Sequence, residues 1–376
     1  MFTFPVDTRD LFEERSRQFA KWGMPSSTIR RVQARVNDNW REGPGGWAYE
    51  WMQEAEAAER KGLFMQASMI YGAARFPTAV TPLRELALKR QAACFERAAD
   101  RIPGHFERRH IALACAGGQS VPVHIYAPDD SGKQPLVLLS GGVDSGKSEL
   151  HRMALLLARV GRFRVAAVDM PGTCESRAAM LLKPDAEQLY LELLRILAPT
   201  GPVGVMGVSF GGHWAAKLAL MDAVDAVVNF GGPVTVFETG GKFLRSLPNG
   251  MPGIVSNAYG LAAMPDDVEI DAIMEPFSLR RQGLLEGDKC SPMLVVNGEN
   301  DQYIPQHDSR MFARYPGNQV WLMRGMTHCA AEGVARILPA MIAWLRLRLY
   351  GETMSTRLLF ELTKTILPAH EIVQAD

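Results

Sequence analysis

The feature that most constrains the fold is a series of short apolar runs that begins after Pro103. Helical stretches separate these runs, which read PLVLLSGG, FRVAAVDMPG, PVGVMGVS, DAVVNFGG, PMLVVNGEND and QVWLMRGMTH. Strands that are apolar on both faces are typical of a parallel sheet covered by helices on both sides. The sequence therefore predicts an α/β domain that binds its ligands at the carboxyl ends of the strands.

The chain of 376 residues is long enough for such a domain together with further elements. Residues 1–104 have apolar positions at three- and four-residue spacing, which predicts an all-helical module. Residues 105–351 would form the α/β domain, which starts with a strand pair and contains a helical insertion at about 235–288. Residues 352–376 form a tail whose amphipathic stretch, STRLLFELTKTIL, is expected to be a packing helix or a dimer contact.

Charge and composition restrict the kind of partner. Lysine plus arginine and aspartate plus glutamate number 41 each, so no overall field attracts nucleic acid or an anionic membrane. No stretch approaches the roughly 18 apolar residues that cross a bilayer, and the start lacks the pattern of a signal peptide. The five cysteines include no CxxC pair, so no disulfide framework or zinc site is expected. We expect a cytoplasmic protein with a small-molecule substrate and no metal.

The stretch GVMGVSFGG matches the pattern GxSxG through Gly207, Ser209 and Gly211. It lies between an apolar run and a helical stretch, which is the setting of a nucleophile elbow. In such an elbow the strand turns sharply into the helix, and small residues on both sides of the serine prevent clashes. An ordinary glycine-rich turn is the alternative interpretation. The pattern predicts Ser209 as a nucleophile.

A serine hydroxyl needs a histidine base that a carboxylate holds in place, in the chain order Ser, Asp, His. Asp301 follows one apolar run, and His328 follows the next. Glu299 is the competing acid, and His213, one turn beyond Ser209, is the competing base. The other histidines precede the sheet core, lie in a helix or follow the acid too closely. We predict Asp301 and His328 as the partners of the serine.

The stretch LVLLSGGVDSGKSELHR fits two patterns. Residues 141–148 match GxxxxGK[ST], the phosphate-binding loop of nucleotide hydrolases, and Asp169 would then be the magnesium ligand. In a hydrolase the same loop gives an N–H group of Gly142 or Val143 to an oxyanion hole, and Phe210 gives the second N–H. We favour the hydrolase, because the nucleotide interpretation leaves the elbow, the acid and the histidine without a role.

These stretches together resemble the FrsA-like α/β hydrolases, which include 2,6-dihydroxypseudooxynicotine hydrolase and fungal enzymes that shorten a polyketide chain. The residues that carry the resemblance are the helical module and the stretches GGVDSGKSE, GVSFGG, GENDQYIP and GMTHC. The resemblance spans about residues 22–349. It implies an α/β-hydrolase fold, a triad of Ser209, Asp301 and His328, a substrate contact from Asp144, and a homodimer. The family often has two acids after the lysine of the loop, whereas this chain has serine and then glutamate.

The sequence therefore predicts a serine hydrolase that acts through an acyl-enzyme and without a cofactor. Its carbonyl substrate would be cleaved at a carbon–carbon bond, as in a β-diketone or polyketide-like compound, or at an ester or thioester. The helical module and the insertion would cover the active site. Aromatic and methionine side chains of the module would line the pocket or form the core of the module: Trp47, Trp51, Met65, Tyr71 and Phe76. A P-loop nucleotide-binding protein and a noncatalytic helical scaffold are the alternatives.

Overall fold

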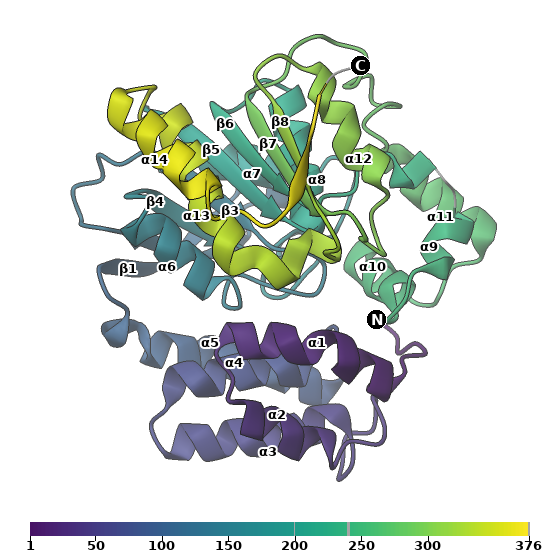
Figure 1. Ribbon diagram of the computed structural model, residues 1–376. Helices are drawn as coiled ribbons and strands as arrows, with labels where there is room; N and C mark the ends of the chain where they lie inside the picture. The colour runs from purple at the N-terminus through teal and green to yellow at the C-terminus, as the bar shows by residue number, and fades with distance from the viewer. Residues whose placement is uncertain (199, 239–240, 375–376) are drawn as a thin grey trace.

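The computed structural model describes residues 1–198, 200–238 and 241–374, and it has a helical layer beneath an α/β layer (Figure 1). Asp7 caps the first helix by accepting the N–H groups of Arg9 and Asp10, and Gly23 ends it in a left-handed conformation. The layer, called the helical module below, consists of α1 (Thr8–Trp22), α2 (Ser26–Gln33), α3 (Trp47–Arg60), α4 (Phe64–Arg75) and α5 (Pro82–Arg97). The predicted all-helical module is confirmed.

Aromatic rings fill the interior of the helical module. Phe12, Phe19, Trp47, Trp51 and Phe76 are all buried. Neighbouring ring centroids lie between 4.5 and 6.5 Å apart, within the range at which aromatic pairs attract one another. Of the residues that the sequence places in the pocket or the core, Trp47, Trp51, Tyr71 and Phe76 are core residues, and Met65 packs partly buried against them.

The α/β layer is built on one sheet that contains nine strands within the described residues, in the order β1-β2-β4-β3-β5-β6-β7-β8-β9. The strands from β4 to β8 pair in parallel, whereas β1, β2 and β9 pair antiparallel at the edges. The bounds are β1 (His105–Ala112), β2 (Ser120–Ala127), β3 (Leu136–Ser140), β4 (Arg164–Val168), β5 (Val203–Val208), β6 (Ala226–Phe230), β7 (Met293–Gly298), β8 (Gln319–Met323) and β9 (His370–Val373). The predicted parallel sheet is thus present at the centre.

Helices cover both faces of this sheet. Val137 and Leu139 of β3 pack in one hydrophobic cluster with α6 (His151–Arg159) and α13 (Val334–Leu349). Leu136 and Leu138 point to the opposite face, into a cluster with α7 (Glu187–Leu197) and α8 (Phe210–Leu220). This alternation follows from the two-residue period of a strand, and it explains why the strands are apolar throughout.

The predicted helical insertion lies between β6 and β7. It contains α9 (Gly241–Ser246), α10 (Met251–Tyr259) and α11 (Asp267–Met274), which lie together at one side of the sheet (Figure 1). The start of the chain is attached to it, because Phe2 and the side chain of Asn257 exchange two hydrogen bonds of 3.0 Å. Short 3-10 turns complete the chain: η1 (Ala99–Arg101), η2 (Ala114–Ala116), η3 (Ser176–Ala178), η4 (Val236–Glu238), η5 (Glu275–Phe277), η6 (Met311–Arg314) and η7 (His328–Gly333).

The tail folds back on the sheet. After the short helix α12 (Gln306–Arg310) and strand β8, the chain continues through α13 to α14 (Met354–Lys364). Phe360 of α14 is buried, and its ring stacks on Trp321 at 6.1 Å. The sequence does not predict β9, since four residues are too few to show a periodic pattern.

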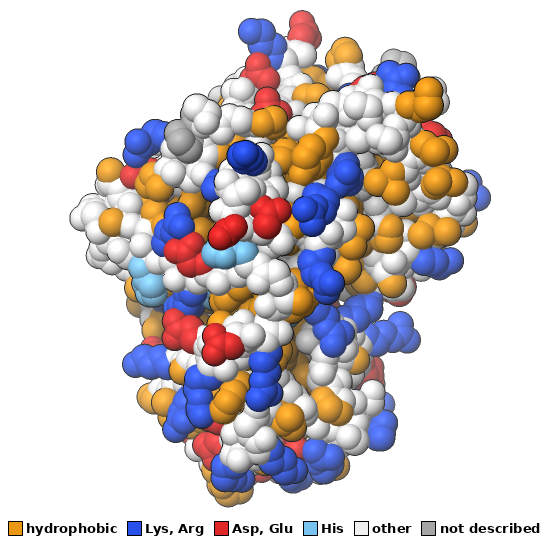
Figure 2. Space-filling model, turned by 90° about the vertical axis from the view of Figure 1, so that its left-hand side faces the viewer, with side chains coloured by type: hydrophobic (Ala, Val, Ile, Leu, Met, Phe, Trp, Pro, Cys, Tyr) orange, Lys and Arg blue, Asp and Glu red, His pale blue; other side chains and the backbone are white. Residues whose placement is uncertain are grey.

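Charges of both signs are mixed on the face of the molecule shown in Figure 2. Lysine and arginine side chains lie among acidic and hydrophobic ones there, in keeping with the zero formal net charge. No helix among the described residues is long and apolar enough to cross a membrane.

Candidate active site

Ser209 lies in the tight turn between β5 and α8, with φ 56° and ψ −131°. Such a conformation is strained for any residue with a side chain. A Cβ atom on Gly207 would lie 2.0 Å from the carbonyl oxygen of Gly211, and a Cβ atom on Gly211 would lie 2.5 Å from that of Gly141. The Ser209 N–H donates a 2.8 Å hydrogen bond to the Phe230 carbonyl. The turn therefore has the geometry of a nucleophile elbow and depends on both flanking glycines.

His328 lies between Ser209 and Asp301. Its Nε2 atom is 2.9 Å from Ser209 Oγ, and its Nδ1 atom is 2.7 Å from Asp301 Oδ2. Because a carboxylate only accepts, Nδ1 is the donor, and Nε2 is left to accept the serine proton. The three residues follow β5, β7 and β8, whose carboxyl ends meet at one edge of the parallel sheet. The structure thus brings together the three residues predicted from the sequence.

The carboxylate of Asp301 is held by several donors, and its side chain is only 1% exposed. Oδ1 accepts the backbone N–H groups of Tyr303 at 2.7 Å and Ile304 at 3.1 Å. Oδ2 accepts the amide of Asn297 at 2.8 Å, in addition to His328. These donors fix the carboxylate in one orientation toward the imidazole.

The acid and the base have shifted pKa values. Burial opposes the charged form of Asp301, but His328 and the hydrogen bonds to the carboxylate outweigh burial and lower its pKa. Burial also opposes protonation of His328, yet the neighbouring Cys329 sulfur and the Asp301 carboxylate raise the pKa of His328 well above its ordinary value. Both shifts stabilise an imidazolium beside a carboxylate, the charge state that forms once His328 has taken the serine proton.

The competing acid and base have other contacts. Glu299 accepts the backbone N–H of Gly325 at 3.2 Å. His213 is buried and donates from Nδ1 to the Pro233 carbonyl at 3.0 Å. Burial lowers the pKa of His213 to about 3, so it is a neutral core histidine. Asp301 and His328, rather than these two residues, form the hydrogen-bonded row with the serine.

The predicted oxyanion residues lie next to the serine. A Cβ atom on Gly142 would be 2.9 Å from Ser209 Oγ, so only glycine allows this close approach. Val143 and Phe210 line the same pocket as the serine. Within the described ranges, the backbone N–H groups of Val143 and Phe210 donate to no other residue, and they remain available to a developing anion.

A cavity opens in front of Ser209, with about 620 Å³ of space free of protein atoms, part of which is open to solvent. Its polar lining residues are Ser209, His328 and Tyr303, and no charged side chain of a described residue other than His328 lines it. The insertion supplies much of the hydrophobic wall: Phe243, Leu244, Leu247, Met251, Val255 and Met274. The helical module adds no lining residue from the described part of the chain, so its large aromatic residues do not shape this pocket.

Asp144, predicted to contact substrate, is not among the residues that line the cavity. Its carboxylate forms an ion pair with Arg15 of α1 at 2.9 Å, and both side chains are buried. The neighbouring Glu14 accepts the hydroxyl of Tyr303, a lining residue, at 2.6 Å. No motif in the sequence singles out Glu14, Arg15 or Tyr303. The one sequence feature that could have pointed to Tyr303 as a pocket residue is its position two residues after Asp301, the predicted acid.

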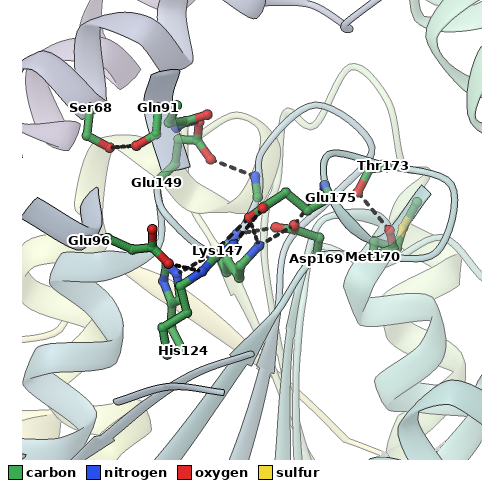
Figure 3. A network of polar contacts seen from close by, with 12 residues as sticks. Ser68, Gln91, Glu96, His124, Lys147, Glu149, Asp169, Met170, Thr173 and Glu175 are labelled. Carbon is green, nitrogen blue, oxygen red and sulfur yellow. Dashed lines mark hydrogen bonds and ion pairs between the residues drawn. The ribbon is translucent and has the colours of Figure 1, made fainter. Parts of the chain in front are cut away.

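The nucleotide-binding alternative is wrong, because the loop after β3 uses its lysine and two of its N–H groups for contacts within the protein. The N–H of Gly146 donates to Glu149 at 2.8 Å, and the N–H of Lys147 donates to Asp169 at 2.7 Å. The Lys147 ammonium lies between Asp169 at 2.6 Å and Glu175 at 2.7 Å (Figure 3). The groups that would bind a phosphate and a magnesium ion therefore bind one another. Among the described side chains, no group of three or more His, Cys, Asp or Glu residues is placed to hold a metal ion.

The chain is similar to known hydrolases in sequence. Residues 33–350 match the model of the Esterase FrsA-like family. Esterase FrsA of Salmonella paratyphi B is 28% identical over 290 residues, which cover 71% of this chain and 68% of that protein. Esterase FrsA of Salmonella newport gives the same values.

Solved structures show the same fold. AbyA5 superposes with a TM-score of 0.79 at 21% identity, covering 96% of this chain and 99% of that one. The 2,6-dihydroxy-pseudo-oxynicotine hydrolase superposes with a TM-score of 0.69 at 21% identity, covering 89% of this chain and 95% of that one. The predicted α/β-hydrolase fold is confirmed, and the alternative of a noncatalytic scaffold is wrong. The chain belongs to the FrsA-like esterase family and is an enzyme of the α/β-hydrolase class.

Proposed function

We propose that the enzyme is a serine hydrolase in which Ser209 is the nucleophile, His328 the general base and Asp301 the acid that orients the base. The observation that carries the proposal is the row of hydrogen bonds from Asp301 through His328 to a strained serine at a cavity. Strain in such a turn exposes the hydroxyl to substrate.

In this mechanism the Ser209 hydroxyl attacks the substrate carbonyl carbon while His328 Nε2 takes its proton. The N–H groups of Phe210 and of Val143 or Gly142 bind the oxyanion, and one such donor contributes about 3 kcal/mol of transition-state stabilisation. His328 then gives the proton to the leaving group, and an acyl-enzyme remains. Water, activated by the same histidine, releases the carboxylic acid and restores the serine.

The cavity supports a small, neutral carbonyl substrate with an apolar acyl group, because its walls are hydrophobic apart from the reacting side chains and Tyr303. The similar proteins named above include an esterase and a 2,6-dihydroxy-pseudo-oxynicotine hydrolase. We propose an ester, a thioester or a carbon–carbon bond of a β-diketone or polyketide-like compound as the scissile bond. In the last case the leaving group is a stabilised enolate that His328 protonates.

We also propose that the enzyme is a homodimer that uses α14 and the turn after it. Three apolar side chains of α14 lie at four-residue spacing and share one helix face, and they are 87%, 58% and 57% exposed: Met354, Leu358 and Leu362. Ile366, in the turn after the helix, is 48% exposed. A continuous apolar stripe of this kind is typical of an association surface. Light scattering should give the mass of a dimer for the wild type and the mass of a monomer for Leu358→Glu. A monomeric wild type would contradict the proposal.

Covalent labelling tests the catalytic proposal. A fluorophosphonate should add one label to the wild type, as measured by intact-mass spectrometry, and p-nitrophenyl esters should be hydrolysed. Ser209→Ala should lose both the label and the activity. Ser131→Ala, which removes a hydroxyl in an exposed loop, is the matched control and should keep both. Labelling of Ser209→Ala at the wild-type rate would refute the assignment.

A further inference from the structure

We propose that the helical module holds the oxyanion loop, defined as residues 141–149, in its working position, and that Glu149 is the positioning residue that connects the two. This inference depends on the proposed function, in which Val143 of this loop stabilises the oxyanion. It gives the helical module a role in catalysis that does not require it to touch substrate.

The carboxylate of Glu149 joins three separate parts of the chain. Its Oε1 atom accepts Arg75 of α4 at 2.7 Å and the side-chain amide of Gln91 of α5 at 2.6 Å. Its Oε2 atom accepts the backbone N–H of Gly146, within the loop, at 2.8 Å. The side chains of Glu149 and Arg75 are 1% and 3% exposed, and Figure 3 shows Glu149 beside Gln91. In this low-dielectric site the contacts are strong and directional.

Two more contacts attach the loop to the helical module, both at Asp144, the residue after Val143. The Asp144 carboxylate pairs with Arg15 of α1 at 2.9 Å. The Asp144 carbonyl accepts a longer hydrogen bond of 3.4 Å from Arg75. Three of the five helices of the module thus send a polar side chain to this loop.

The opposite side of the loop is fixed to the sheet. Lys147 contacts Asp169, which directly follows β4, through both its backbone N–H and its ammonium group. A Cβ atom on Gly146 would lie 2.5 Å from Asp169 Oδ1 and 2.8 Å from Cys174 Sγ. The loop is therefore packed between the sheet and the helical module, and it cannot shift without breaking buried ion pairs.

This arrangement explains why the loop matches a phosphate-binding pattern. The glycine, lysine and glutamate residues provide close approach and internal ion pairs rather than a site for an anion. A displacement of about 1 Å in a positioning element typically lowers a rate about 10²-fold. Loss of the Glu149 contacts should therefore weaken stabilisation of the oxyanion without changing the apolar walls that bind the substrate.

Glu149→Gln tests the inference, because it keeps the shape of the side chain and removes its charge. We expect kcat for a p-nitrophenyl ester to fall about 10- to 100-fold, with KM within about 2-fold of the wild type. Affinity for an alkyl trifluoromethyl ketone, which forms a tetrahedral oxyanion on the serine, should fall in parallel with kcat. Glu187→Gln is the matched control, since Glu187 of α7 is also a buried carboxylate, 8% exposed, in a 2.6 Å ion pair with Lys217. It should leave kcat and the inhibitor affinity unchanged.

The inference is wrong if folded Glu149→Gln keeps the wild-type kcat and inhibitor affinity, or if only KM rises. If Glu149→Gln does not fold, Gln91→Met replaces it as the test, because it removes one hydrogen-bond donor to Glu149. The same criteria apply, and kcat should fall by a smaller factor, about 3- to 10-fold. A wild-type enzyme that takes no label at Ser209 would instead refute the proposed function. The two failures are therefore distinguishable.

Discussion

The hydroxyl of Tyr303 donates a hydrogen bond of 2.6 Å to the carboxylate of Glu14, and it thereby connects the loop that carries Asp301 to α1. The backbone N–H of the same tyrosine holds Asp301 at 2.7 Å. Its ring meets the ring of His328 edge to face, with centroids 5.1 Å apart. One residue therefore contacts Asp301, His328 and the helical module.

Tyr303→Phe should lower the free energy of unfolding by about 1–3 kcal/mol, because it leaves a half-buried Glu14 carboxylate without its hydroxyl donor. Urea denaturation measures the change. Tyr350→Phe is the control, since the Tyr350 hydroxyl donates to the Arg162 carbonyl at an exposed site, where loss of a hydrogen bond has little effect. Equal losses in the two variants would contradict the expectation.

Asp301→Asn should lower kcat/KM about 10³- to 10⁴-fold, because asparagine does not hold the imidazole in the required tautomer. The pH profile should change as well. His328 is a base only when neutral, so activity falls as the pH decreases through its pKa. The Asp301 carboxylate is one of the groups that raise this pKa, so its loss should move the acid limb of the profile to lower pH.

A pH profile of kcat/KM from about pH 5 to pH 10 measures this change, because it includes the ordinary titration range of a histidine and extends above it, where the raised pKa of His328 lies. Glu299→Gln is the control, since it removes a nearby exposed carboxylate that hydrogen bonds to Gly325 and not to the imidazole. An acid limb that stays in place in Asp301→Asn would show that the carboxylate does not set the pKa of His328.

Gly207→Ala should destabilise the fold by more than about 2 kcal/mol and abolish labelling of Ser209. The added Cβ atom would lie 2.0 Å from the Gly211 carbonyl oxygen, so the elbow must open to accommodate it. Gly43→Ala is the control, because a Cβ atom there has no neighbour within 4 Å and the backbone needs no positive φ. Thermal unfolding and fluorophosphonate labelling measure the two effects, and a labelled Gly207→Ala would contradict the strain argument.

The positions of Ser209, Asp301 and His328 were predictable from the sequence because each follows an apolar run. Parallel strands end at one edge of a sheet, so residues that follow different strands converge there. Position within the loop then favoured Asp301 over Glu299, and position after a strand favoured His328 over His213, which lies in a helix. For these residues the local sequence pattern is therefore enough to predict their place in the folded protein.

The contacts that fix the oxyanion loop were not predictable in the same way. Glu149 lies 74 residues from Arg75 and 58 residues from Gln91, and hydrophobic periodicity says nothing about which charged residues of two helices meet a distant loop. The pocket wall is a similar case. The insertion was identified, but which of its apolar side chains turn toward the serine depends on how three short helices pack.

Leu244→Trp should restrict the length of the acyl chain that the enzyme accepts. Leu244 lies on α9 and lines the cavity, so a larger side chain there fills space that a long acyl group occupies. We expect kcat/KM for p-nitrophenyl octanoate to fall at least about 10-fold. One methylene group that does not fit a hydrophobic pocket changes the transition-state binding energy by roughly 1–3 kcal/mol, which corresponds to a factor of this size. The acetate ester, which reaches only the serine, should be hydrolysed at the wild-type rate. Leu86→Trp, at an exposed position of α5, is the control for the added indole. Equal losses of activity toward both esters in Leu244→Trp would show that Leu244 does not border the acyl group.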